Sequence, residues 1–269
     1  MLVTDKFVML NLPKTGSTFS RQALRRIHFG GRLKQAAIRF GLHDAGMEEL
    51  MMKQFYFTDL DAGANRVARQ HGCYCQIPAQ HREKTIFSCV RDPFRRLVSL
   101  YEYAAWKHQV FPSREIVTDR FAHFPDLSFE EFFDLECRIG PTYSQPEGVQ
   151  VEIGPLTTQF IRFFARDPVK TILSLREDTD LKADYDTHFP AITFLHTENL
   201  NQELAAFLGD IGYTPRQLAF LQDARKTNVS GRSRQSYFTP GLVAELLQRE
   251  RFFFQLFPEY LPQADSQGA

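Results

Sequence analysis

The chain has 269 residues, of which 43% are hydrophobic and 24% are charged. This balance is typical of a folded globular protein and excludes a wholly disordered or collagen-like chain. The 32 basic and 32 acidic side chains cancel, which argues against a nucleic-acid partner bound through net charge but leaves room for a local basic pocket.

Two further features bear on where the protein works. No uncharged apolar run approaches the roughly 20 residues that span a bilayer. Asp5 and Lys6 interrupt the apolar start of the chain, so we expect neither a transmembrane segment nor an export signal. Four cysteines are too few for a disulfide framework. Reduced thiols are typical of cytoplasmic proteins, and we therefore expect a cytoplasmic location.

Strands and helices are predicted to alternate from the start of the chain. The apolar run at residues 6–12 predicts a buried strand, and residues 17–28 have helical periodicity. The β-branched and aromatic residues at 85–90 predict a second strand. The helix that follows begins with Asp92 as its N-cap and Pro93 in its first position.

The second half of the chain is predicted to continue this alternation after a less regular middle at residues 107–155. It comprises a short helix after Ser128, a loop at 140–154, a helix at 156–164, a strand at 191–196, a helix at 202–211 and a last helical segment that begins at Thr239 and Pro240. Such alternation indicates an α/β fold with a parallel, helix-covered sheet. The 26 phenylalanines indicate an aromatic core.

The first predicted strand and helix are joined by residues 13–18, Pro-Lys-Thr-Gly-Ser-Thr. A strand that turns through glycine into a helix favours an anion, because free N–H groups and the helix dipole meet there. Gly16 allows close approach, Ser17 and Thr18 add hydroxyl donors, and Lys14 adds a mobile charge. The alternative is a plain turn with Ser17 as helix cap. The order differs from the Walker A motif, where the lysine follows the last glycine directly.

This loop resembles the 5′-phosphosulfate loop of the sulfotransferases, which use 3′-phosphoadenosine 5′-phosphosulfate (PAPS) as sulfuryl donor. Residues 91–101, RDPFRRLVSLY, resemble the family's 3′-phosphate motif, in which an arginine at a strand end is followed eight residues later by a serine, here Arg91 and Ser99. Taken alone, this second motif could instead hold an arginine paired with a carboxylate and a serine that faces solvent. Residues 197–200 (TENL) look like the family's late strand–helix unit, and residues 227–230 (TNVS) look like its nucleotide-covering loop.

The resemblance implies a P-loop-like three-layer fold with a central, mainly parallel sheet flanked by helices, as one domain over residues 1–269. Within it, residues 107–155 would form an acceptor-side insertion and residues 225–239 the nucleotide-covering loop. The residues that it assigns to PAPS binding are Lys14, Thr15, Gly16, Ser17 and Thr18 on the 5′ side, Arg91 and Ser99 at the 3′-phosphate, and Asn228 and Ser230 in the covering loop. Lys14 would also be catalytic, acting at the leaving-group oxygen, and the chemistry would need no metal.

The acceptor hydroxyl needs a proton acceptor, for which histidine is the usual choice near neutral pH. We favour His71, because glycosaminoglycan O-sulfotransferases have a catalytic histidine in a similar place before the Arg-Asp-Pro strand. The alternatives are a structural role for His71 and a carboxylate base such as Glu48 or Glu49. On a strand, His71, Cys73 and Cys75 would share one face and could bind zinc with His81, although this spacing matches no common zinc module.

The expected activity is therefore transfer of a sulfuryl group from PAPS to a hydroxyl of a saccharide or a small hydroxylated metabolite. Two alternatives stay open. One is a nucleotide-dependent kinase or other phosphotransferase, which would bind ATP with Mg²⁺. The other is a non-catalytic module that binds a phosphonucleotide without turnover.

Overall fold

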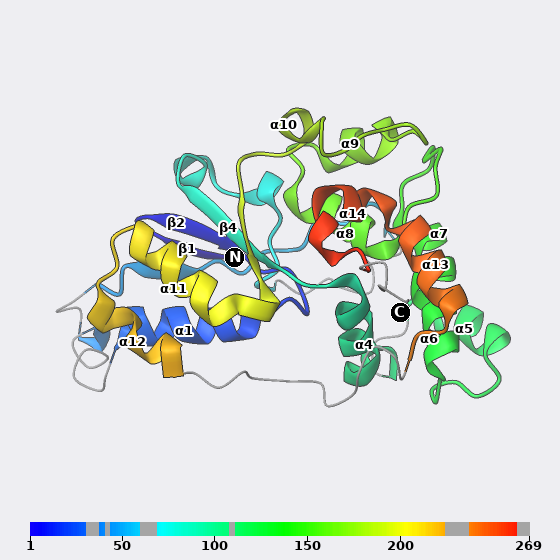
Figure 1. Cartoon of the computed structure of the whole chain (residues 1–269), viewed down its shortest axis with the longest axis horizontal. Coiled ribbons are helices and arrows are strands. Elements are labelled where there is room, and N and C mark those ends of the chain that lie inside the picture. The colour runs from blue at the N-terminus through cyan, green and yellow to red at the C-terminus, as the bar shows by residue number, and fades with distance from the viewer. Residues whose placement is uncertain (31–37, 41–43, 60–68, 108–110, 224–236, 263–269) are drawn as a thin grey trace, which may run out of the picture. The chain divides into compact units, whose positions relative to one another are not determined.

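A computed structural model of the chain describes residues 1–30, 38–40, 44–59, 69–107, 111–223 and 237–262 (Figure 1). The chain divides into two compact units. The sheet unit comprises Met1–Phe55, Arg66–Arg91 and Ala191–Gly231, and the helical unit comprises Tyr56–Asn65, Asp92–Pro190 and Arg232–Ala269. The single domain over residues 1–269 and the acceptor-side insertion stay predictions.

The sheet unit contains a five-stranded sheet in the order β3-β1-β2-β4-β5. Its strands are β1 (Leu2–Thr4), β2 (Phe7–Leu10), β3 (Met47–Glu49), β4 (Thr85–Val90) and β5 (Thr193–His196). The pairs β2–β4 and β4–β5 are parallel, whereas β1 is antiparallel to both β2 and β3. Four of these described strands therefore run in the same direction, and the predicted α/β fold with a mainly parallel sheet is confirmed.

The sequence pattern missed the two strands at one edge of this sheet. The predicted strand at 6–12 is β2, which ends at Leu10. It begins one residue later than predicted because the chain turns just before it: the Thr4 hydroxyl accepts hydrogen bonds from the amides of Lys6 and Phe7 at 3.1 and 3.0 Å. This turn makes β1 a three-residue strand of its own. Strand β3 contains Glu48 and Glu49 and shows no apolar run that could have indicated it.

Helices α1 (Ser17–Phe29), α11 (Leu200–Asp210) and α12 (Pro215–Asp223) complete the core of the sheet unit. On α1, residues Ala23, Leu24 and Ile27 are buried, at the three- and four-residue spacing that places side chains on one helix face. Phe7 and Phe87 of neighbouring strands meet edge to face at 5.3 Å. The helix predicted at 17–28 is thereby confirmed, and the packing of this face on the core fixes the position of the helix that follows the glycine turn at residues 13–16.

The helical unit is built around an aromatic core, as the phenylalanine content predicts. Its helices are α4 (Pro93–Tyr103), α5 (Arg114–Arg120), α6 (Phe129–Phe133), α7 (Gly140–Ser144), α8 (Pro155–Phe164), α9 (Pro168–Ser174), α10 (Tyr185–His188), α13 (Pro240–Arg249) and α14 (Arg251–Leu256). Phe163, Phe252 and Phe253 are almost fully buried. No helix in the described ranges is long and apolar enough to cross a membrane.

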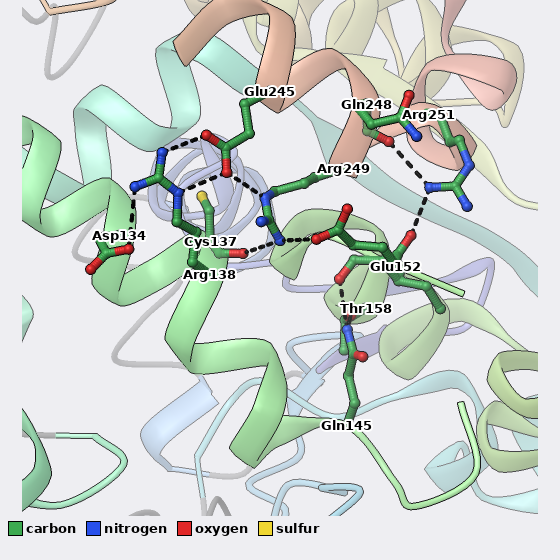
Figure 2. A network of polar contacts seen from close by, with 11 residues as sticks. Asp134, Cys137, Arg138, Gln145, Glu152, Thr158, Glu245, Gln248, Arg249 and Arg251 are labelled. Atoms are coloured by element: carbon green, nitrogen blue, oxygen red, sulfur yellow. Dashed lines mark hydrogen bonds and ion pairs between the residues drawn. The ribbon is translucent and has the colours of Figure 1, made fainter. Parts of the chain in front are cut away.

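The loop predicted at 140–154 is wrong in its first part, where α7 follows a π-helix at Asp134–Ile139. α7 continues directly from the π-helix, because Ile139 and Gly140 keep helical backbone angles and Pro141 follows them without ending the helix. Figure 2 shows how this region is held: Arg249 bonds the Cys137 carbonyl at 3.1 Å and pairs with Glu245 at 2.8 Å. Glu245 also accepts from Arg138, and these contacts lower the pKa of Glu245 to about 2.

Candidate active site

The turn between β2 and α1 has the backbone of an anion-binding loop. Gly16 is the N-cap of α1 with φ 82°, and a Cβ on it would lie 2.6 Å from Cδ2 of Leu200. A residue with a side chain would therefore be strained and would also clash. Glycine provides no side-chain cap, and the first turn of α1 contains no acidic residue. The first N–H groups of α1 are thus left for an anion.

Side chains hold the carbonyl groups of this turn. Arg91 Nη1 donates to the Lys14 carbonyl at 3.3 Å, and the Thr15 hydroxyl donates to the Leu12 carbonyl at 2.9 Å. Thr197 Oγ1 donates to the Thr15 carbonyl, also at 2.9 Å. Thr15 is fully buried, and its hydroxyl is used in the bond to the Leu12 carbonyl.

Lys14 and Arg91 place two positive charges together. Burial, and then the neighbouring charge of Arg91, lower the pKa of the Lys14 ammonium. Arg91 directly follows β4, and β4 runs parallel to β2, so both residues lie beyond the carboxyl ends of adjacent parallel strands. Open α/β sheets bind ligands at this edge. An anion placed here would be stabilised by both cations, which would relieve their mutual repulsion.

His71 is bonded to the chain just before this turn. Its Nδ1 lies 2.6 Å from the carbonyl oxygen of Asn11, three residues before Lys14. A carbonyl only accepts, so Nδ1 carries the proton and Nε2 presents a lone pair in the neutral ring. Burial is the largest influence on the ring and lowers the pKa of His71, despite the opposing effect of the Asn11 bond. The imidazole is therefore held in the tautomer and charge state of a base.

Two other histidines of the sheet unit, His28 and His196, have different partners. His28 is buried, with Nδ1 at 3.0 Å from the Ala45 carbonyl and Nε2 at 2.8 Å from the Tyr213 hydroxyl. Both of its ring nitrogens are thus used inside the fold. His196 Nδ1 pairs with Glu203 at 3.1 Å. His71 is distinguished by its bond to the strand end that leads into the glycine turn.

The carboxylate alternatives are less suited to accept a proton. Glu49 pairs with Arg21 at 2.8 Å and with Arg25 at 2.6 Å, both on α1. Burial alone would raise the pKa of Glu49, but the bonds from these two guanidinium groups lower it overall. A carboxylate that is held in its ionised form by two arginines is a weak base. Glu48 is exposed on β3.

The strand on which the zinc alternative depends is absent from the described segment around His71. Residues Tyr74–Gln76 form a short 3-10 helix that begins after Cys73. Period-two alternation therefore does not apply to His71, Cys73 and Cys75. Among the described residues, no group of three or more histidine, cysteine or acidic side chains could hold a metal ion.

The remaining assigned residues are less closely tied to the turn. Ser17 is buried at the start of α1, and Thr18 is exposed. Ser99 is half-buried on α4, which belongs to the helical unit. Asn228 and Ser230 lie outside the described residues.

The roles of two residues of the site escaped the sequence reasoning. Asn11 gives the carbonyl that orients His71, and Thr197 bonds the loop from a position 182 residues away in sequence. Asn11 could have been noticed as a polar residue in the predicted first strand. The role of Thr197 had no local signal, because it depends on how β5 lies against β4.

The comparisons with known proteins identify one family. A family model described as the sulfotransferase family matches residues 1–251, which include the glycine turn, His71 and Arg91. No curated protein and no solved structure matches the chain. Because the matched region is most of the chain, this protein belongs to the sulfotransferase family.

Proposed function

We propose that the protein transfers a sulfuryl group from PAPS to an acceptor hydroxyl, with Lys14 and His71 as catalytic residues. The observation that carries this proposal is the meeting of Lys14, Arg91 and the open N-terminus of α1 at one turn. A phosphosulfate is a large anion that needs several donors and cations, and this turn offers both.

The donor would be held through both of its phosphate groups. Backbone N–H groups of residues 15–18, with the hydroxyls of Ser17 and Thr18, would bind the 5′-phosphate. Arg91 and Ser99 would bind the 3′-phosphate, and Asn228 and Ser230 would cover the nucleotide. The left-handed conformation of Gly16, whose missing Cβ would clash with Leu200, supports this assignment, because it fixes the turn from which α1 starts.

The transfer step assigns one role to each catalytic side chain. His71 Nε2 takes the proton from the acceptor hydroxyl as the hydroxyl oxygen forms its bond to sulfur. The bond between sulfur and the 5′-phosphate oxygen breaks, and that oxygen keeps the electron pair. Lys14 stabilises the charge that develops on it. The products are the sulfated acceptor and adenosine 3′,5′-bisphosphate.

The proposed acceptor is a saccharide or a small hydroxylated metabolite, and no nucleic-acid partner is proposed. The zero net charge supports the second point. The four cysteines are free, which fits a reducing compartment and supports a cytoplasmic location.

A product-release assay tests this function. The protein would be incubated with PAPS and a panel of saccharides and hydroxylated metabolites, and release of adenosine 3′,5′-bisphosphate would be measured. We expect an acceptor-dependent release that Lys14→Ala removes, whereas the exposed Lys182→Ala retains it. Consumption of ATP with Mg²⁺, with no release from PAPS for any acceptor, would favour the phosphotransferase alternative.

A further inference from the structure

Thr197 bridges the central sheet and the glycine turn. It is the first residue after β5, and its Oγ1 lies 2.7 Å from the Val90 carbonyl and 2.9 Å from the Thr15 carbonyl. Val90 ends β4, which is paired on both sides within the sheet. A hydroxyl has one proton, so Thr197 shares a single donor between these two carbonyls, with the shorter distance to Val90. The threonine side chain thereby connects a fixed strand end to the turn at the start of α1.

The bonds to the carbonyls also set the direction of the amides. A trans peptide is planar, with its C=O and N–H pointing in opposite directions. The Lys14 carbonyl shares a peptide unit with the Thr15 amide, and the Thr15 carbonyl shares one with the Gly16 amide. Arg91 holds the first carbonyl, and Thr197 holds the second. Both amides are consequently turned away from these two side chains.

We propose that Thr197 is a positioning residue for sulfuryl transfer, which aims the Gly16 N–H at the 5′-phosphate by holding the Thr15 carbonyl. This inference rests on the function proposed above. The same segment supports the loop a second time, since Leu200 fills the space beside Gly16. The segment after β5 therefore sets both the direction of the amide and the room around it.

In this proposal the hydroxyl group of Thr197 positions the loop, and the shape of the side chain does not. Valine has the same branched shape as threonine but no donor, so Thr197→Val leaves the carbonyls of Thr15 and Val90 without this bond. Serine keeps the donor and loses only a methyl group. Thr193→Val is a matched control, because Thr193 is an exposed threonine at the other end of the same strand.

The test measures binding of three nucleotides by calorimetry, directly or by displacement: adenosine 3′,5′-bisphosphate, adenosine 5′-monophosphate and adenosine 3′-monophosphate. We expect Thr197→Val to weaken the two ligands with a 5′-phosphate about tenfold, the usual effect of one lost hydrogen bond. Adenosine 3′-monophosphate should bind as it does to the wild type. Thr197→Ser should restore binding to within about twofold, and Thr193→Val should change nothing.

Each other result decides against the proposal. Equal weakening of all three nucleotides would show a general structural role, and unchanged binding would show no role. If Thr197→Val does not fold, as judged by thermal unfolding, Thr197→Ala and Thr197→Ser give the same comparison. Failure of the wild type to bind the bisphosphate would overturn the proposed function and this inference with it, whereas normal wild-type binding with an unaffected variant overturns the inference alone.

Discussion

Two strand–turn–helix segments of this chain are alike in connection and opposite in electrostatics. Between β2 and α1, Gly16 caps the helix without a side chain, and the first helical turn has no acidic residue. Between β4 and α4, the Asp92 carboxylate accepts from the Phe94 amide at 2.8 Å, and Pro93 takes the first helical position. The first helix has no carboxylate at its N-terminal amides, whereas the second bonds its Phe94 amide to its own Asp92 carboxylate.

The difference shows that one fold element can be used in two ways. At the first turn the backbone is the binding group, so its conformation matters most. At the second turn the helix start already has a negative charge, so recognition has to come from side chains, of which Arg91 is directly before the cap. Sequence alone distinguishes the two, because glycine and aspartate at an N-cap have opposite consequences for an anion.

The largest effect is expected from loss of the proposed general base, His71, which is bonded to the chain just before the first turn. His71→Ala should lower the turnover of PAPS by about 10²–10⁴-fold, the range for loss of a general base. Binding of the bisphosphate should stay within about twofold, because His71 is assigned to the acceptor proton. Steady-state kinetics and calorimetry measure the two quantities, with the exposed His123→Ala as control. An active His71→Ala variant would remove this residue as the base.

The next largest effect is expected from a substitution that strains the backbone of the first turn. Gly16→Ala introduces a side chain at φ 82° and against Leu200, so it should destabilise the fold by about 1–3 kcal/mol and weaken the bisphosphate at least about tenfold. Gly209→Ala on α11 is the control, for which the expected change in stability has the opposite sign. Its Cβ would have no neighbour nearer than 4.0 Å among the atoms compared, and the substitution should stabilise by about 0.4–1 kcal/mol.

Thermal unfolding with and without the bisphosphate compares these two glycine variants. If Gly16→Ala bound the nucleotide as tightly as the wild type, a glycine conformation would not be required at this turn.

A smaller effect tests the second turn. Asp92→Ala removes the carboxylate that caps α4 and should cost about 1 kcal/mol of stability, whereas Asp92→Asn keeps an acceptor oxygen and should recover most of it. Denaturant unfolding measures the difference. Equal stability of Asp92→Ala and the wild type would show that this cap does not hold the helix, and the contrast between the two turns would lose its physical basis.

The smallest effect is a displacement of the pH profile. His71 must be neutral to accept a proton, and burial lowers its pKa from the ordinary 6.5. Turnover should therefore stay high as the pH falls to 6.5 and decline only at lower pH, as the ring becomes protonated. The pH dependence of kcat/KM, which reports the pKa of the free enzyme, measures this limb. A decline that begins above pH 7 would contradict a buried neutral His71 as the base.

Periodicity and capping rules correctly predicted the elements whose structure depends on residues close together in sequence. The helix at 17–28, the strand at 85–90 and the caps Asp92 and Thr239 all follow from periodicity and capping chemistry, and the structure confirms them. These rules act over a few residues, so the sequence pattern contains the information they need.

Prediction failed where a feature depends on distant contacts. Strand β3 contains two glutamates and has no apolar pattern that would predict a strand. One of them, Glu49, forms ion pairs with arginines of α1, which are distant in sequence. The hydroxyl of Thr197 and the carbonyl of Asn11 act only because the sheet brings distant segments together. Helix α7 was missed because a glycine and a proline near its start are also typical of a loop.

The most direct test of the central claim is calorimetric titration with adenosine 3′,5′-bisphosphate, compared with ATP plus Mg²⁺ and repeated with Arg91→Ala. The account predicts binding of the bisphosphate that Arg91→Ala weakens by about 10- to 100-fold, the range for loss of a charged hydrogen bond. Tight binding of ATP with Mg²⁺, together with no binding of the bisphosphate, would contradict it.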